Sequence, residues 1–145
     1  MLQKLKEMNP DNKLDVIAIP GTAEIFNSSP VVDEVIILDK KGEQKSFLSM
    51  FRFTKMIRNR NYSAIYSPHR SFRTAFIVIQ SGVKETFGFN NSSMFHVYRN
   101  IVEYIQTDHE VKRNLSLIGY NTDNENWKIL PQLITDFSIV EKVKD

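Results

Sequence analysis

Short apolar runs alternate along this chain with segments whose apolar residues recur every three to four positions. The apolar runs predict strands at 14–19, 34–38, 62–66 and 83–89. The recurring pattern predicts helices at 2–8, 22–26, 46–59, 71–80 and 109–118. One further segment, 97–105, fits a strand or a helix equally. Because strands alternating with helices over short distances are typical of βαβ units, we expect an α/β protein whose mostly parallel sheet carries helices on both faces, in three layers.

Polar and glycine residues mark the ends of the expected helices. Thr22 and Ser71 stand where a helix would begin, and their hydroxyls can accept a hydrogen bond from a backbone N–H of the first turn. Thr107 or Asp108 is expected to cap the last helix in the same way. Gly82 is expected to end the helix that begins at Ser71, since glycine readily adopts the left-handed conformation common at helix ends.

The segment 46–59 predicts an amphipathic helix. Its apolar side is expected to comprise Phe47, Leu48, Phe51, Met56 and Ile57. Most of its cations lie elsewhere, and they are Arg52, Lys55, Arg58 and Arg60. Such a cluster is more often the solvated end of a helix than a binding site.

Composition excludes several classes of protein. The formal net charge of +2 on 145 residues is too balanced for a nucleic-acid binder held by phosphate charge. The chain has no cysteine, so disulfides and zinc–thiolate sites are excluded, and this fits the reducing cytoplasm. No stretch of about 18 apolar residues is present, and charges interrupt the apolar residues at the N-terminus, so neither a membrane span nor a secretory signal is expected.

One loop combines several groups that bind anions. The segment Ser67–Arg73 places a histidine, two arginines and a helix N-terminus directly after an expected strand. In parallel α/β sheets, ligands bind beyond the carboxyl ends of the strands. We therefore predict a site for phosphate or carboxylate there, with a capped helix and solvated arginines as the alternative. His109 and Arg113, four residues apart on the last helix, could reach an anionic ligand, but a solvated helix face is the favoured explanation of this pair taken alone.

Other catalytic signatures are missing from the sequence. It contains neither Gly-x-Gly-x-x-Gly nor a Walker lysine loop, and no Gly-x-Ser-x-Gly elbow of serine hydrolases. Its three histidines show no metal-ligand spacing such as His-x-x-x-His. We therefore expect no metal site and no cofactor in this chain, and these patterns by themselves identify no catalytic residue.

Four segments resemble glycosyltransferase family nine, the ADP-heptose:lipopolysaccharide heptosyltransferases. They occur in the family's order, and they are Pro30–Ile36, Asn61–Ala75, Gln80–Phe89 and His109–Gly119. The resemblance implies the GT-B fold, which has two Rossmann-like domains, and a bacterial enzyme that transfers heptose from ADP-heptose to the lipopolysaccharide inner core without a metal. It also implies that the anionic sugar acceptor is bound by His69, Arg70, Ser71, Arg73, His109 and Arg113.

The resemblance covers only part of such an enzyme. Residues 1–120 correspond to the Rossmann-like acceptor-side domain and 121–145 to the interdomain linker or a tail, so the family's first strand, its Gly-Asp loop and its donor domain are expected to be absent. Without that first strand, the strands at 14–19 and 62–66 must pair with each other or leave exposed edges, which favours self-association.

Three functional interpretations remain open. The chain is an incomplete heptosyltransferase that is inactive alone, one half of a split glycosyltransferase, or a non-catalytic module that binds a sugar phosphate or a protein. In each case ADP-heptose is a partner only if another chain supplies a donor domain. Nucleic acid is not an expected partner. The expected location is the cytoplasm, and peripheral contact with the inner face of the inner membrane is left open.

Overall fold

The computed structural model describes residues 1–123 and 127–133. Within this part the chain forms two compact units, one built from residues 2–43 together with 130–133 and the other from Met1 together with 44–123 and 127–129. The expectation of an α/β protein with parallel strands is confirmed, because both units contain a parallel sheet with helices between its strands. The expected domain boundary at residue 120 stays a prediction.

The first unit contains one βαβ element. It comprises α1 (Leu2–Met8), β1 (Asp15–Ala18), α2 (Pro20–Asn27) and β2 (Glu34–Ile37). The two strands are parallel, with Val16 opposite Val35 and Ile17 opposite Ile36. Helix α2 begins with Pro20 at its first position, where the missing proline N–H costs no hydrogen bond. The residue before it, Ile19, is therefore the N-cap, and the predicted cap at Thr22 is wrong.

Asp33 fixes the start of β2 in this unit. Its carboxylate accepts hydrogen bonds from the Leu14 N–H (2.7 Å) and from Lys6 Nζ (2.9 Å). These bonds, the one from the Leu14 backbone foremost, lower the pKa of Asp33 below its ordinary value. The carboxylate thus ties together helix α1, the entry to β1 and the entry to β2.

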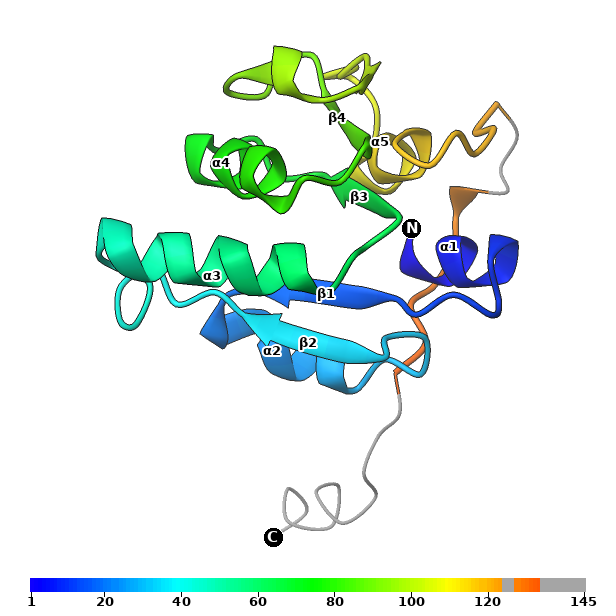
Figure 1. Ribbon diagram of the computed structural model, residues 1–145. Coiled ribbons are helices and arrows are strands. Elements are labelled where there is room, and N and C mark those ends of the chain that lie inside the picture. Colours follow the sequence, from blue (N-terminus) through cyan, green and yellow to red (C-terminus); the bar gives the residue numbers. More distant parts are fainter. Residues whose placement is uncertain (124–126, 134–145) are drawn as a thin grey trace, which may run out of the picture. The chain divides into compact units, whose positions relative to one another are not determined.

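The second unit carries a three-stranded parallel sheet in the order β3-β4-β5. Its elements are α3 (Phe47–Asn59), β3 (Ala64–Ser67), α4 (Phe72–Ser81), β4 (Glu85–Phe89), the 3-10 helix η1 (Phe95–Val97), β5 (Asn100–Val102) and α5 (Glu110–Ser116). In Figure 1, α4 and α5 lie on opposite sides of β3 and β4. Tyr66 pairs with Phe87 across the sheet, and their rings stack at 4.5 Å. The apolar core of the unit includes Phe53, Ile57, Ala75, Val78, Phe89, Leu115 and Leu117.

The ends of α4 follow the sequence prediction, and the start of α5 does not. Ser71 caps α4, and Gly82 ends it in the left-handed conformation, at φ 69°. Helix α5 is capped by His109 instead of Thr107 or Asp108, because its imidazole Nδ1 accepts the Val111 N–H at 3.2 Å. The undecided segment 97–105 holds the strand β5.

Helix α3 presents a different side to the core than its sequence suggests. Its buried residues are Met50, Phe53, Thr54 and Ile57. Phe47, Leu48 and Phe51, expected on the apolar side, are exposed by 81%, 62% and 51%. Thr54 can replace an apolar residue in the core because its hydroxyl donates to the Phe51 carbonyl at 2.9 Å. The predicted buried side of this helix was therefore wrong over its first two turns.

Strands β1 and β3 belong to different sheets. In the described part of the chain β1 pairs with β2, and β3 lies at one edge of its sheet and pairs with β4. The alternatives of mutual pairing and exposed edges stay predictions. Self-association stays a prediction. No helix within residues 1–123 or 127–133 has the length and apolar character needed to cross a bilayer.

Candidate functional site

The candidate site begins where β3 ends, at the loop that leads into α4. Ser71 ends this loop, and its Oγ accepts a hydrogen bond from the Thr74 N–H at 3.3 Å. The hydroxyls of Ser71 and Thr74 lie 2.9 Å apart. Ser71, expected to contact an acceptor, therefore uses its side chain to start the helix.

His69 is held by the same capping group. Its Nδ1 lies 3.4 Å from the Ser71 backbone nitrogen and 3.2 Å from Thr74 Oγ1. Because a backbone N–H can only donate, Nδ1 acts as the acceptor and the proton of the neutral ring resides on Nε2. The His69 side chain is exposed.

The buried side chain of Tyr98 supports the loop after β3 through hydrogen bonds. The Tyr98 hydroxyl donates to Ser67 Oγ at 3.1 Å, and Ser67 Oγ donates to the His69 carbonyl at 3.1 Å. Tyr98 fits because Gly88, on the neighbouring strand β4, has no side chain: a Cβ there would lie 2.5 Å from the Tyr98 ring. Burial raises the pKa of Tyr98, and its hydrogen bond with Ser67 offsets part of that rise. This neutral chain of hydroxyls fixes the backbone of the loop.

Two of the arginines selected from the sequence meet at one aromatic ring. The guanidinium carbon of Arg70 lies 4.5 Å from the centre of the Tyr104 ring, and that of Arg113 lies 4.7 Å from it. Both distances are those of cation–π contacts. Arg70 is exposed, and its carbonyl accepts the Ser93 N–H at 3.0 Å. The loop after β3 is thus joined to the segment after β4.

Tyr104 is itself held in place by the end of β4. Its ring packs edge-on against that of Phe89, with the ring centres 5.2 Å apart, and its backbone N–H donates to Asn90 Oδ1 at 3.0 Å. Phe89 is 1% exposed. The ring that receives both guanidiniums therefore rests on the core.

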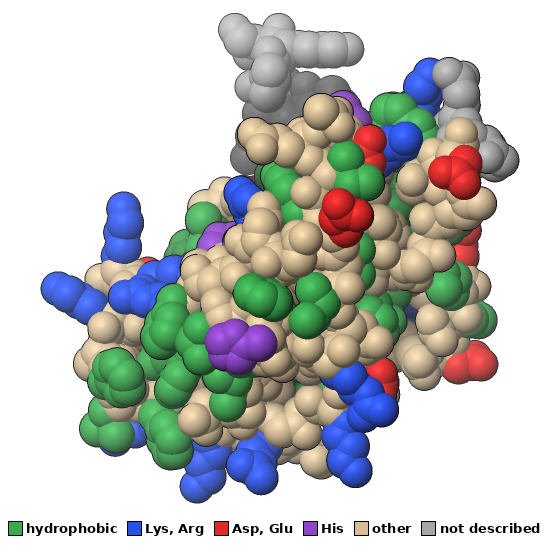
Figure 2. All heavy atoms as spheres, turned by 90° about the horizontal axis from the view of Figure 1, so that it is seen from above, with side chains coloured by type: hydrophobic (Ala, Val, Ile, Leu, Met, Phe, Trp, Pro, Cys, Tyr) green, Lys and Arg blue, Asp and Glu red, His purple; other side chains and the backbone are tan. Residues whose placement is uncertain are grey.

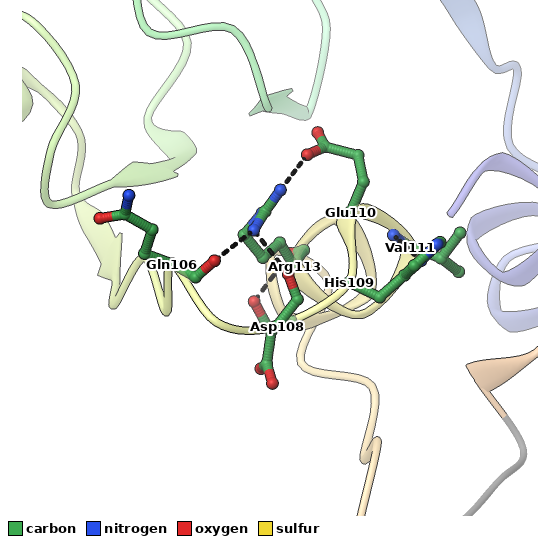
Figure 3. Close-up of polar contacts among 7 residues, drawn as sticks. Gln106, Asp108, His109, Glu110, Val111 and Arg113 are labelled. Atoms are coloured by element: carbon green, nitrogen blue, oxygen red, sulfur yellow. Dashed lines mark hydrogen bonds and ion pairs between the residues drawn. The ribbon is translucent and has the colours of Figure 1, made fainter.

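Arg113 uses its guanidinium N–H groups mainly for hydrogen bonds within the protein. Its Nη1 donates to the carbonyls of Gln106 (3.2 Å) and Asp108 (2.5 Å), and its Nη2 pairs with the Glu110 carboxylate (Figure 3). This pairing raises the pKa of Arg113 above its already high ordinary value. The side chain is 14% exposed. Arg113 therefore fixes the loop 106–110 and the Tyr104 ring instead of facing solvent.

His109 does not join this cluster. Figure 3 shows its side chain and that of Arg113 pointing in different directions from α5. The His109 imidazole caps α5, and its ring lies 5.3 Å from that of Trp127. The expectation that both residues face one ligand from a common helix face has no support in this arrangement.

The structure thus brings together some of the residues selected from the sequence. His69, Arg70 and Ser71 share one loop, and Arg70 and Arg113 share Tyr104. Arg73 lies exposed in the first turn of α4. Whether any of them binds an acceptor stays a prediction. Among the described residues, no group of three or more His, Asp or Glu side chains could hold a metal ion.

Sequence reasoning missed Tyr104. It follows β5 by two residues, so the rule that selected the loop after β3 would have selected it as well. Because the segment 97–105 fitted a helix and a strand equally, the end of a strand could not be located there.

The fold defines a structural class: part of a Rossmann-like α/β protein, with parallel strands joined by helices. Over 99% of its length the chain matches the crystal structure of the glycosyl transferase family 9 from Veillonella parvula DSM 2008, with a TM-score of 0.74 and 15% sequence identity. Over 97% it matches the structure of E. coli ADP-heptose lps heptosyltransferase II, with a TM-score of 0.73 and 18% identity. The chain covers 42% and 43% of these two proteins.

These matches confirm, at the level of the fold, the resemblance found in the sequence. Both solved structures carry the names that the four sequence segments suggested. No protein-family model matches the chain, and no curated protein does.

Proposed function

We propose that this chain is the acceptor-side part of a lipopolysaccharide heptosyltransferase, which transfers heptose from ADP-heptose to a Kdo- or heptose-containing inner-core acceptor. In this proposal the loop 67–73 binds the acidic acceptor. The observation that carries it is the position of Arg70: beyond the carboxyl end of β3, exposed, and over the Tyr104 ring. Both solved structures of similar fold bear glycosyltransferase names, which supports the reaction class.

The chemistry of the loop suits an acid sugar. A guanidinium that lies over an aromatic ring keeps a defined plane, and its N–H groups lie in that plane, where they match the two oxygens of a carboxylate or phosphate. The His69 Nε2–H adds a neutral donor from the same loop. Arg113 acts as a positioning residue, since it holds Tyr104 and is itself bonded to Gln106 and Asp108.

We assign no catalytic residue to this chain. The family's presumed general base lies in a Gly-Asp loop, and the sequence contains no Gly-Asp dipeptide. The chain therefore contributes acceptor binding to the reaction, and the nucleotide sugar is bound elsewhere. Transfer or hydrolysis of ADP-heptose by this chain alone would contradict that assignment.

Calorimetric titration with a phosphorylated Kdo-type sugar acid tests the binding site. We expect Arg70→Gln to weaken binding about tenfold or more, because a hydrogen bond to a charged group contributes roughly 1.5–3 kcal/mol. Arg52→Gln is the matched control, since Arg52 is an exposed arginine that belongs to α3 and not to the loop 67–73. Equal binding by the wild type and the Arg70 variant, or an equal loss in both variants, would refute the proposal.

A further inference from the structure

The exposed sides of α3 and α4 form one hydrophobic patch. On α4, Phe72 and Ile79 are exposed by 60% and 46%, and Phe76 between them is half-buried, so the three follow one side of the helix at i, i+4 and i+7. On α3 the exposed apolar residues are Phe47, Leu48 and Phe51. The rings of Phe47 and Phe76 meet edge to face, with their centres 6.0 Å apart, so the two sets are continuous.

This patch is unusual because its members are large and mostly aromatic. Figure 2 shows hydrophobic side chains gathered on the side where α3 and α4 lie in Figure 1, with lysine and arginine side chains beside them. Single exposed apolar residues are common, whereas a contiguous group of this kind marks a surface that contacts something else. We therefore call Phe47, Leu48, Phe51, Phe72, Phe76 and Ile79 the aromatic patch.

The segment of sequence that carries the aromatic patch has charges of a single sign. From Gln44 to Lys84 the sequence contains no aspartate or glutamate. The same 41 residues contain eight cations, all exposed, namely Lys45, Arg52, Lys55, Arg58, Arg60, Arg70, Arg73 and Lys84. The other 104 residues hold all 17 acids of the chain. The whole molecule is close to neutral, so this separation of charge is local.

We propose that the aromatic patch docks on an anionic lipid surface. Phenylalanine and leucine enter the boundary between headgroups and acyl chains, while lysine and arginine around them pair with lipid phosphates. A protein partner would have to be both apolar and acidic to match this surface, whereas an anionic bilayer offers both properties everywhere. The inference does not rest on sugar binding by the loop 67–73.

Sedimentation with vesicles tests the proposal. We expect the wild-type chain to bind vesicles rich in phosphatidylglycerol and to bind phosphatidylcholine vesicles much more weakly. Raising the ionic strength from about 0.1 M to about 1 M should weaken the binding, because the Debye length falls from about 10 Å to about 3 Å. Binding that is absent, or that is equal on both kinds of vesicle, would overturn the proposal.

Two pairs of variants locate the surface. Phe47→Ser with Phe72→Ser should reduce vesicle binding at least about tenfold. Its control, Ile25→Ser with Ile101→Ser, removes apolar residues that are 58% and 48% exposed on α2 and β5, and should bind like the wild type. Because all four side chains are exposed, every variant is expected to fold, which circular dichroism verifies. An equal effect of both pairs would overturn the proposal.

The role of the cations is tested with two double variants that have the same net charge as each other. Arg52→Gln with Lys55→Gln removes two charges beside the aromatic patch, and Lys13→Gln with Arg99→Gln removes two elsewhere. Only the first pair should weaken vesicle binding, by several-fold.

The oligomeric state supplies a further test. If the Phe47 and Phe72 variant changes the oligomeric state of a chain that binds no vesicles, the surface is a protein interface and the lipid proposal is wrong.

Discussion

The contact between Gly88 and Tyr98 gives a sharp test of how the loop after β3 is supported. Gly88→Ala would place a Cβ 2.5 Å from the Tyr98 ring, a distance at which one of the two must move. Tyr98 is 3% exposed and has little room, and its hydroxyl is bonded to Ser67. Overpacking a core costs about 1–3 kcal/mol and loss of one hydrogen bond about 0.5–1.5 kcal/mol, so we expect a destabilisation of about 1.5–4.5 kcal/mol.

Urea unfolding measures this loss. The fluorescence of Trp127, the single tryptophan, reports the unit that contains Gly88. Gly21→Ala is the matched control, and its unfolding is followed by far-ultraviolet circular dichroism because Gly21 lies in α2, in the other unit. No atom lies within 4 Å of its added Cβ, so alanine there should stabilise the helix by about 0.4–1 kcal/mol. The same substitution thus has opposite signs at two glycines.

A double-mutant cycle identifies the cause. In a Tyr98→Ala background the ring is gone, so Gly88→Ala should cost at least about 1 kcal/mol less than in the wild type. The reasoning is refuted if Gly88→Ala leaves the stability within about 0.5 kcal/mol of the wild type, or if its cost is the same with and without the tyrosine ring.

Three further predictions concern single side chains. Ser67→Ala should destabilise the fold by about 1–3 kcal/mol in the same urea assay, since the Tyr98 hydroxyl loses its acceptor. Ser92→Ala should cost little stability, because Ser92 Oγ is buried without a hydrogen-bond partner in the described residues. The lowered pKa of Asp33 contributes stability that is present above its ordinary pKa of 3.8 and is lost as the pH falls through the folded-state value. The free energy of unfolding measured against pH should therefore fall less in acid for Asp33→Asn than for the wild type, and an unchanged profile would contradict this. Tyr104→Leu should weaken sugar-acid binding in calorimetry while the Arg70 charge remains, and unaltered affinity would argue against a role for the ring.

The fold follows from the sequence where local signals agree. The β-branched run at 34–38 and the serine and glycine around α4 set a strand and two helix ends that the structure shows. The side of α3 that faces the core could not be predicted, because Phe47 and Phe53 are equally apolar and only the packed structure distinguishes them. The cap at His109 was missed because a histidine accepts a backbone N–H only when its ring is suitably turned.

The sequence predicted where the candidate site lies, but not which side chains it brings together. The rule that ligands bind beyond parallel strands located the loop of Arg70. The rule could not reveal that Arg113 turns to the backbone of its own loop, since this depends on where the carbonyls of Gln106 and Asp108 point. Tyr104, which joins the two arginines, has no motif of its own.

The bonding of Arg113 has a consequence for reading relatives of this chain. One planar group satisfies two carbonyls and a carboxylate at once, a geometry that the single nitrogen of a lysine does not reproduce. A relative with lysine at this position should therefore show altered residues at 106–110 as well. Covariation of Arg113 with residues 106–110 would reflect how the loop is built. Variation at Arg70 alone would reflect a change in what the protein binds.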